Sequence, residues 1–161
     1  MMEKILFEIE MKDGDVMKGE LYPDIAPKTV ENFVKLINQN FYDGLIFHRV
    51  IPGFMIQGGG MDENMTPKHT DAIVGEFASN GINNSLLHTR GVLSMARTMV
   101  KNSASSQFFI MHEDAPHLDG DYAAFGKIIE GLDIVDRIAN VSRNRMDCPY
   151  EPIVIKTMRL L

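Results

Sequence analysis

The 161-residue chain has one cysteine, no long apolar run and no excess of positive charge, and each absence excludes a class of protein. Cys148 can form neither an intramolecular disulfide nor a Cys-x-x-Cys metal knuckle, which favours a reducing compartment. No segment approaches the ~20 consecutive apolar residues that a membrane-spanning helix needs. The net charge of -6 at pH 7 argues against a nucleic-acid or anionic-membrane partner.

The amino-terminal segment lacks the features of a secretory signal. Its apolar run is short and is interrupted by Glu8 and Glu10, and no small-residue cleavage site follows. We therefore expect a cytoplasmic protein. A chain of this length, with 45% hydrophobic and 24% charged residues, fits one globular domain over residues 1–161. Nothing in the sequence demands more than a monomer.

Short alternating segments predict that most of the chain is β-structure. Ile5, Phe7 and Ile9 alternate with other residues as in a strand that has one solvated face, and a turn at 13–15 joins it to a partner at 16–22. Further strands are predicted at 47–51, 54–58, 91–96, 107–112, 123–130 and within 151–161.

Two amphipathic segments predict helices. Pro27 can open a helix over 27–38, and apolar residues recurring every three to four positions predict a second helix over 132–140. Short strands with frequent turns favour an antiparallel barrel or sandwich, and closure into a barrel would remove exposed strand edges. Residues 60–90 have little periodicity and are interpreted as long surface loops, which are often functional in a compact domain.

Three of the predicted strands each place an apolar residue and a strongly hydrogen-bonding residue on one face, because side chains alternate along a strand. The pairs are Phe47 with Arg49, Met55 with Gln57, and Gln107 with Phe109. The same alternation places Phe54 on the opposite face. An apolar patch with a few fixed polar groups has the composition of a binding site. Ordinary exposed strand residues would explain the pattern equally well, because one sequence does not reveal which strands are adjacent.

Other kinds of site find little support. No two histidines have the spacing of a metal-binding motif, and no Gly-x-Ser-x-Gly segment marks a nucleophile. Cys148 lies in a polar segment and is interpreted as incidental. The glycines at 58–60 lack the lysine of a phosphate-binding loop, and we interpret them as a tight turn that leaves a strand. The histidines considered are His48, His69, His88, His112 and His117.

Four segments together resemble the cyclophilin family. The first and third are long and specific, and the resemblance runs from the first hairpin to the last strand, so it covers nearly the whole chain. Their amino-acid sequences are more similar to the prokaryotic branch of the family than to its animal cytosolic members. The segments are FHRVIPGFMIQGGG (47–60), GVLSMART (91–98), NSASSQFFI (102–110) and LDGDYAAFGKIIEG (118–131).

The resemblance implies a closed eight-stranded antiparallel β-barrel capped by two α-helices, with peptidyl-prolyl cis-trans isomerase activity, no cofactor and no metal. The site of this family lies on the outside of the barrel. By similarity, Arg49 is the catalytic arginine, and Gln57 and Gln107 orient the arginine and the substrate backbone. The resemblance assigns Phe54, Met55, Phe109 and Leu118 to the pocket for the proline ring, and Ala96, Arg97 and Thr98 to the groove for the preceding residues.

Several positions depart from the best-known members of the family. His117 replaces a common tryptophan, and the chain contains no tryptophan at all, so we expect weakened binding of cyclosporin, whose usual indole contact is missing. Tyr122 replaces a common histidine, and both of these positions are still expected to border the substrate. Arg97 and Thr98 replace a common asparagine and alanine. Residues 61–80 lack the glycine-rich loop of animal members, so no binding residue is assigned there.

The leading hypothesis is therefore an isomerase that acts on proline-containing peptides and unfolded protein chains. A second hypothesis is a binding module or chaperone that holds proline segments without turnover, although such a module has no need of Arg49. A third is a barrel that carries a small ligand inside. Phe47 or His48, together with Phe108 and Phe125, should fill that interior, which argues against the third hypothesis.

Overall fold

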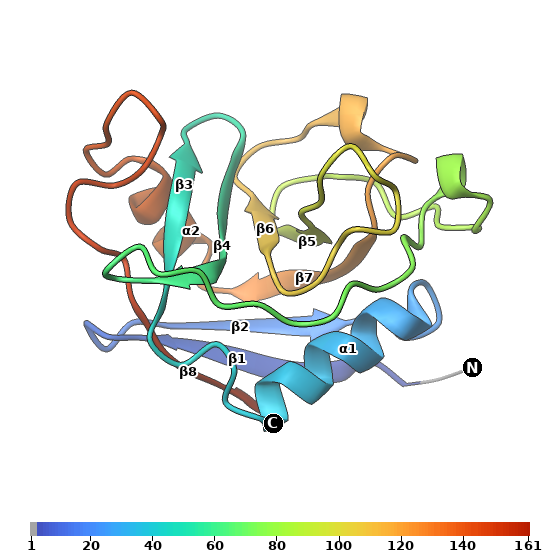
Figure 1. Ribbon diagram of the computed structural model, residues 1–161, viewed down its shortest axis with the longest axis horizontal. Coiled ribbons are helices and arrows are strands. Elements are labelled where there is room, and N and C mark those ends of the chain that lie inside the picture. Colours follow the sequence, from blue (N-terminus) through green and yellow to red (C-terminus); the bar gives the residue numbers. More distant parts are fainter. Residues whose placement is uncertain (1–2) are drawn as a thin grey trace.

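The computed structural model describes residues 3–161, whose strands form one eight-stranded antiparallel sheet curled into a nearly closed barrel (Figure 1). The strand order is β3-β4-β6-β5-β7-β2-β1-β8. The strands are β1 (Ile5–Met11), β2 (Val16–Leu21), β3 (Leu45–Ile51), β4 (Met55–Asp62), β5 (Val92–Met95), β6 (Phe108–Met111), β7 (Ala124–Glu130) and β8 (Ile155–Leu160).

The barrel closes where β3 approaches the segment that leads into β8. Ile46 and Val154 form an isolated antiparallel bridge. The Phe47 N–H donates to the Ile153 carbonyl at 3.0 Å, and the Gly44 N–H donates to the Ile155 carbonyl at 2.8 Å. These bonds pair part of the edge that an open sheet would expose. The predicted eight-stranded barrel is thereby confirmed.

Two helices pack their apolar faces against the interior of the barrel. Helix α1 (Pro27–Asn38) has the predicted bounds, and α2 (Leu132–Ala139) ends one residue earlier than predicted. Helix α1 contacts β8, and α2 lies beside β3 and β4 (Figure 1). The Phe33 ring of α1 is the centre of an aromatic cluster, with the Phe108 ring centroid at 5.5 Å and the Phe125 centroid at 5.0 Å.

Aromatic side chains occupy the space inside the barrel that an internal ligand would need. Phe47, Phe108 and Phe125 are all fully buried in the interior cluster, which they share with residues of both helices. Edge-to-face ring contacts of this kind give a close-packed core rather than a cavity. The interior therefore offers no support for the hypothesis of a carrier barrel.

Strand β3 differs from the predicted alternation at one position. The pairing of β3 with β4 shifts register between Phe47 and Arg49, so that His48 is an extra residue in the strand. Phe47 therefore points into the barrel while Arg49 is exposed outside it. The prediction that these two residues share a face was wrong, because a bulge changes the parity of every later residue.

The glycines at 58–60 lie inside β4 instead of in a turn that leaves it. Gly58 packs against the chain of β3, where an added Cβ would lie 2.7 Å from the Ile46 carbonyl oxygen. The strand therefore continues to Asp62, four residues beyond its predicted end. The interpretation as a turn was wrong because glycines also serve where two backbones approach closely.

The long connection between β4 and β5 contains only a short 3-10 turn, Ala78–Asn80, and otherwise consists of loops, as predicted. These loops lie against the same side of the barrel as β5 and β6 in Figure 1. Within residues 3–161, no helix has both the length and the apolar character needed to span a bilayer.

Candidate active site

A pocket of about 160 Å³ opens on the outer surface of the barrel. Its floor is a second apolar cluster, separate from the barrel interior, to which Met55, Phe109 and Leu118 belong. Arg49 is at its rim. We call it the Arg49 pocket, and its lining consists of Arg49, Phe54, Met55, Gln57, Ala96, Arg97, Phe109, Leu118 and Tyr122.

A chain of side-chain amides holds Arg49 at the pocket. Arg49 and Gln57 are register partners on β3 and β4, and an Arg49 Nη1 group donates to Gln57 Oε1 at 3.4 Å. Gln57 Nε2 in turn donates to Gln107 Oε1 at 2.9 Å. Because Gln107 accepts from the Gln57 amide nitrogen, the amide oxygen of Gln57 is left facing the guanidinium. The chain fixes the orientation of Gln57 and thereby presents an acceptor to Arg49.

Gly60 provides the space that Gln107 occupies. A Cβ at position 60 would lie 2.5 Å from the Cγ, Cδ and Nε2 atoms of Gln107, too close for the two to coexist. Gly60 is not in the left-handed region, so this position requires glycine because of the neighbouring side chain and not because of its backbone angles. The absence of a side chain here allows Gln107 to reach Gln57.

Arg97 forms the wall between the Arg49 pocket and a second hollow. Its guanidinium lies between two rings, 4.7 Å from the Phe77 centroid and 4.6 Å from the Tyr122 centroid. Its Nη2 group donates to the Asp121 carbonyl at 2.6 Å. Rings on both sides of a guanidinium hold it by cation–π attraction and packing. The adjoining hollow, of about 250 Å³, is lined by Gln57, Ala96, Arg97, Thr98, Ser103, Ser105 and Gln107.

A buried hydrogen-bonded chain supports the floor of the pocket. His88 Nδ1 is 3.0 Å from an Asp119 carboxylate oxygen, and His88 Nε2 is 2.8 Å from the Ser94 hydroxyl. A carboxylate only accepts, so Nδ1–H donates to Asp119 and Nε2 accepts from Ser94. The imidazole stacks on the Phe109 ring at a centroid distance of 6.0 Å, and Tyr122 meets the Phe109 ring edge-on at 5.8 Å.

The same chain has the connectivity of a hydrolase triad, but it is closed to substrate. Ser94 is 0% exposed and His88 is 1% exposed, so no peptide can reach the hydroxyl. Burial lowers the pKa of His88, although the hydrogen bond to Asp119 opposes that effect, and the ring is therefore favoured in its neutral form. The chain holds Phe109 in place and offers no nucleophile.

The histidine beside the catalytic-arginine candidate has a different environment. Burial lowers the pKa of His48, and the positive charge of Arg49 lowers it further. Within the part of the chain that the structure describes, His48 Nδ1 is buried without a hydrogen-bond partner. A neutral imidazole therefore adjoins Arg49 and adds no competing charge.

The structure brings most of the predicted site residues around the Arg49 pocket. Thr98 and Gln107 line the adjoining hollow instead. His117 is outside both, exposed, with its ring tilted against the Phe54 ring at a centroid distance of 5.7 Å. Phe54 reaches the pocket from the turn before β4, where strand alternation does not apply, so its predicted face was wrong.

Several residues that shape the site had no signal in the sequence. His88, Ser94 and Asp119 come from three segments, and their contacts depend on the barrel being formed. Phe77 comes from the long connection that was interpreted only as loops. Among residues 3–161, no group of three His, Cys, Asp or Glu side chains is arranged to hold a metal ion.

Comparison with known proteins gives consistent matches over the chain. The family model of the cyclophilin type peptidyl-prolyl cis-trans isomerase/CLD matches residues 6–160. A peptidyl-prolyl cis-trans isomerase of Acinetobacter baylyi is 47% identical over 163 residues, covering 94% of this chain and 84% of the relative. Peptidyl-prolyl cis-trans isomerase B of Bacillus subtilis is 46% identical over 130 residues, covering 81% of this chain and 87% of the relative.

A solved structure agrees with the sequence relatives. The crystal structure of a Cryptosporidium parvum cyclophilin type peptidyl-prolyl cis-trans isomerase, in the presence of the dipeptide Ala-Pro, aligns with a TM-score of 0.82 at 30% identity. The alignment covers 97% of this chain and 98% of that one. The two bacterial relatives agree with the prokaryotic branch that the sequence motifs indicate. The chain therefore belongs to the cyclophilin-type peptidyl-prolyl cis-trans isomerases, enzymes that catalyse rotation about the bond preceding proline.

Proposed function

We propose that the Arg49 pocket binds the proline ring of a peptide or unfolded chain, and that Arg49 stabilises the twisted X–Pro amide during isomerisation. One observation carries this proposal: a guanidinium, oriented by Gln57, stands at the rim of a small pocket with an apolar floor. A proline side chain is apolar and compact, so it suits the floor of Met55, Phe109 and Leu118.

The chemistry needs a group that binds the twisted state better than either planar isomer. The X–Pro bond has a rotation barrier of about 20 kcal/mol, and uncatalysed exchange takes tens to hundreds of seconds. Halfway through the rotation the amide loses conjugation, and its nitrogen becomes a competent hydrogen-bond acceptor. A donor aimed at that nitrogen lowers the barrier because it acts only in the transition state.

Arginine suits this role because its guanidinium stays charged and presents N–H groups in a fixed plane. The acceptor oxygen of Gln57 holds one edge of that plane and leaves other N–H groups free to face the substrate. The apolar floor excludes water and strengthens the interaction. No proton is transferred and no covalent bond to the protein forms, so the reaction requires neither a nucleophile nor a cofactor.

The adjoining hollow supports a direction for the bound chain. With the proline ring over Met55 and Phe109, the residues that precede proline would extend along Ala96, Arg97 and Thr98, where the second hollow begins. Gln107 and backbone groups in this groove would bind the peptide backbone. The relative solved in the presence of Ala-Pro supports a proline-containing ligand for this fold.

Replacing Arg49 tests the proposal. We expect Arg49→Ala to lower kcat/KM on an X–Pro tetrapeptide by about 100-fold or more, as when a transition-state donor is removed. Arg49→Lys should recover little of this loss, because it restores the charge without the planar donor set. Arg49 is exposed, so both variants should keep the melting temperature of the parent.

Arg145→Ala provides the matched control, because Arg145 is an exposed arginine in the loop before β8 and does not line the pocket. It should leave kcat/KM unchanged. Unchanged turnover in Arg49→Ala would refute the proposed mechanism. Peptide binding by the parent protein without exchange between isomers, measured by NMR exchange spectroscopy, would favour the binding-module hypothesis instead.

Four further expectations remain proposals. We infer weakened cyclosporin binding from His117, which an inhibition curve measures directly. We also infer a cytoplasmic location, a monomeric state, and a single functional domain over residues 1–161. The single cysteine supports the expected location, and the length of 161 residues supports a single domain.

A further inference from the structure

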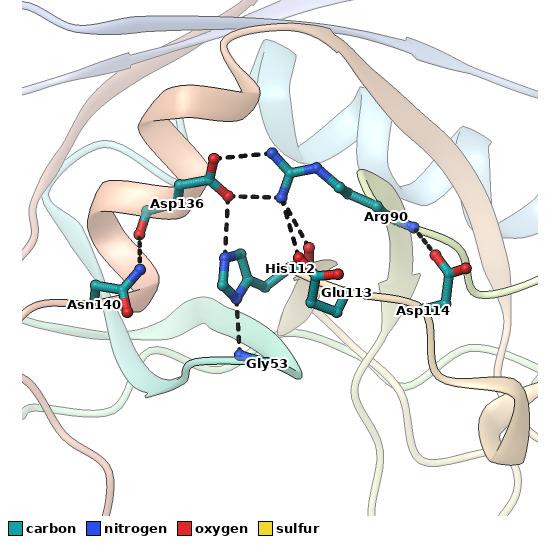
Figure 2. A network of polar contacts seen from close by, with 7 residues as sticks. All are labelled: Gly53, Arg90, His112, Glu113, Asp114, Asp136 and Asn140. Carbon is teal, nitrogen blue, oxygen red and sulfur yellow. Dashed lines mark hydrogen bonds and ion pairs between the residues drawn. The ribbon is translucent and has the colours of Figure 1, made fainter.

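A polar network lies behind the turn that joins β3 to β4, and His112 is at its centre (Figure 2). The Gly53 N–H donates to His112 Nδ1 at 2.8 Å, and His112 Nε2 is 3.0 Å from a carboxylate oxygen of Asp136 on α2. The backbone amide can only donate, so Nδ1 must accept and the ring proton is on Nε2, which donates to Asp136. The neutral imidazole thus joins the turn to the helix.

Arg90 fixes the carboxylate that orients the imidazole. Its two terminal nitrogens donate to the two Asp136 oxygens at 2.6 and 2.9 Å, and its Nη1 also donates to the His112 carbonyl at 2.9 Å. This bidentate pair lowers the pKa of Asp136, which remains a charged acceptor. In Figure 2, Asp136 contacts both Arg90 and the His112 imidazole, and Gly53 lies on the opposite side of that imidazole. His112 is therefore held on one side by a rigid support.

The turn that His112 contacts has a specific conformation. The Phe54 N–H donates to the Ile51 carbonyl at 3.0 Å, Pro52 is at the second position, and Gly53 at the third has a φ of 80°. These are the features of a type II turn, which differs from type I in the orientation of the amide between its two central residues. That amide includes the Gly53 N–H, so an acceptor at His112 Nδ1 selects the type II form.

His112 also holds the next residue of the turn through its main chain. The His112 N–H donates to the Phe54 carbonyl at 2.9 Å, and the Phe54 side chain forms part of the Arg49 pocket. Two bonds from one residue therefore fix both the amide before Phe54 and the carbonyl of Phe54 itself. The position of this aromatic wall depends on them.

We propose that His112 is a positioning residue of the isomerase, whose Nδ1 holds the Pro52–Gly53 turn so that Phe54 forms the wall of the proline pocket. The inference rests on the proposed function of the Arg49 pocket. It assigns the bond to Gly53 a role in substrate binding and the bond to Asp136 a supporting role. A purely structural role for His112 would instead be the attachment of α2 to the barrel.

Two variants of His112 separate these roles, because each keeps one of the two ring contacts. The Oδ1 atom of His112→Asn can stand where Nδ1 stood and accept from Gly53, but the side chain is too short to reach Asp136. The amide nitrogen of His112→Gln can stand where Nε2 stood and donate to Asp136, but it leaves the Gly53 N–H without an acceptor. Melting temperatures of both variants establish that assays are run on folded protein.

We expect His112→Gln to raise KM for an X–Pro tetrapeptide about fivefold, the equivalent of one lost hydrogen bond, with a smaller change in kcat. His112→Asn should keep KM within about twofold of the parent, because it retains that bond. The amide proton of Gly53 should keep its hydrogen-bonded NMR shift in the Asn variant and lose it in the Gln variant. Equal KM values in the two variants would overturn the inference.

A measurement on the unmodified protein keeps the test independent of variant folding. A scalar coupling across the hydrogen bond between the Gly53 nitrogen and His112 Nδ1 should be detectable in uniformly 15N-labelled protein, and its absence would overturn the inference. Phe54→Ala distinguishes the two proposals. If Phe54→Ala leaves KM unchanged, the proposed pocket itself is wrong; if it raises KM while His112→Gln does not, only the role of His112 is wrong.

Discussion

Arg49 faces the surface because a single extra residue, His48, interrupts the alternation of β3. Without the bulge, Arg49 would follow Phe47 into the aromatic interior, where an unpaired charge is very costly. With the bulge, Arg49 meets Gln57 across the strand pair. Bulges commonly re-aim a side chain beside an active site. One backbone irregularity therefore sets the position of the proposed catalytic group.

Gly60 allows the first prediction at the scale of single residues. In Gly60→Ala the new methyl group would occupy the space of the Gln107 side chain, which must rotate away and release Gln57. We expect a modest loss of stability, about 1 kcal/mol, but a larger fall in kcat/KM, about tenfold, because Arg49 loses its oriented partner. Thermal unfolding and a tetrapeptide assay measure the two effects.

The double variant Gly60→Ala with Gln107→Ala is the control. Removing the Gln107 side chain relieves the clash, so stability should rise above that of Gly60→Ala. The activity should remain as low as in Gln107→Ala alone, because the amide chain is still broken. Recovery of full activity in the double variant would contradict this role for Gln107.

Sequence reasoning found the candidate residues more readily than the contacts that hold them. The alternation in FMIQ paired Met55 with Gln57, and the alternation in QFFI paired Gln107 with Phe109. The structure brings Met55, Gln57 and Phe109 together in the lining of the Arg49 pocket. The alternation in FHRV failed at His48, because nothing in a single sequence marks a bulge. The support by His88 was equally hidden, since Asp119 is 31 residues away along the chain.

At the scale of elements, helix α1 depends on a residue far away in the sequence. Its flanking residue Ala26 has no side-chain oxygen, and its first turn contains no acidic residue. Glu76, from the long connection, supplies the missing acceptor: its Oε1 accepts from the Thr29 N–H at 2.5 Å and from the Thr29 hydroxyl at 2.7 Å. A carboxylate at this end also complements the helix dipole. The loop thereby completes the helix.

We expect Glu76→Gln to lower the free energy of unfolding by about 1.5–3 kcal/mol, because the two bonds from Thr29 lose their charged acceptor and a new amide donor is buried without a partner of its own. Glu76 is only 3% exposed, so water cannot replace the carboxylate. Urea unfolding followed by circular dichroism measures the change. Glu63→Gln, an exposed glutamate in the same connection, should change stability by less than about 0.5 kcal/mol. Equal effects of the two substitutions would contradict the capping role.

Elements with a strong periodic signal were predicted well, and those defined by distant contacts were not. The bounds of α1 follow from Pro27 and the apolar stripe, both local features. The end of β4 was missed by four residues, because Gly58 and its neighbours pair with strands that the sequence alone does not identify. Glu76 was missed as a cap for the same reason: 47 residues separate it from Thr29.

At the scale of the whole molecule, burial of titratable groups sets the pH range of stability. Burial lowers the pKa values of His48 and His88, so the folded protein favours both rings in the neutral form. At the alkaline end, burial raises the pKa of Tyr42, whose hydroxyl donates to the Ser106 carbonyl at 2.8 Å. Protonation of the histidines at low pH and loss of the tyrosine proton at high pH both occur more readily in the unfolded chain. The free energy of unfolding therefore falls at either extreme of pH. We expect a stability plateau between about pH 7 and pH 10.

The acid side of this plateau gives the last prediction. As the pH falls through about 6.5, the unfolded chain takes up protons on both histidines while the folded protein resists, so the free energy of unfolding decreases. The loss for one buried histidine is at most about 1.4 kcal/mol per pH unit, or about 3–6 °C in Tm for a chain of this size. Calorimetry between pH 8 and pH 5 measures the slope. His88→Gln should unfold at a lower temperature throughout but with a shallower slope, because one of the two titrating rings is gone. The same slope in both proteins would mean that His88 does not control the acid limb, whatever its contribution to packing beneath Phe109.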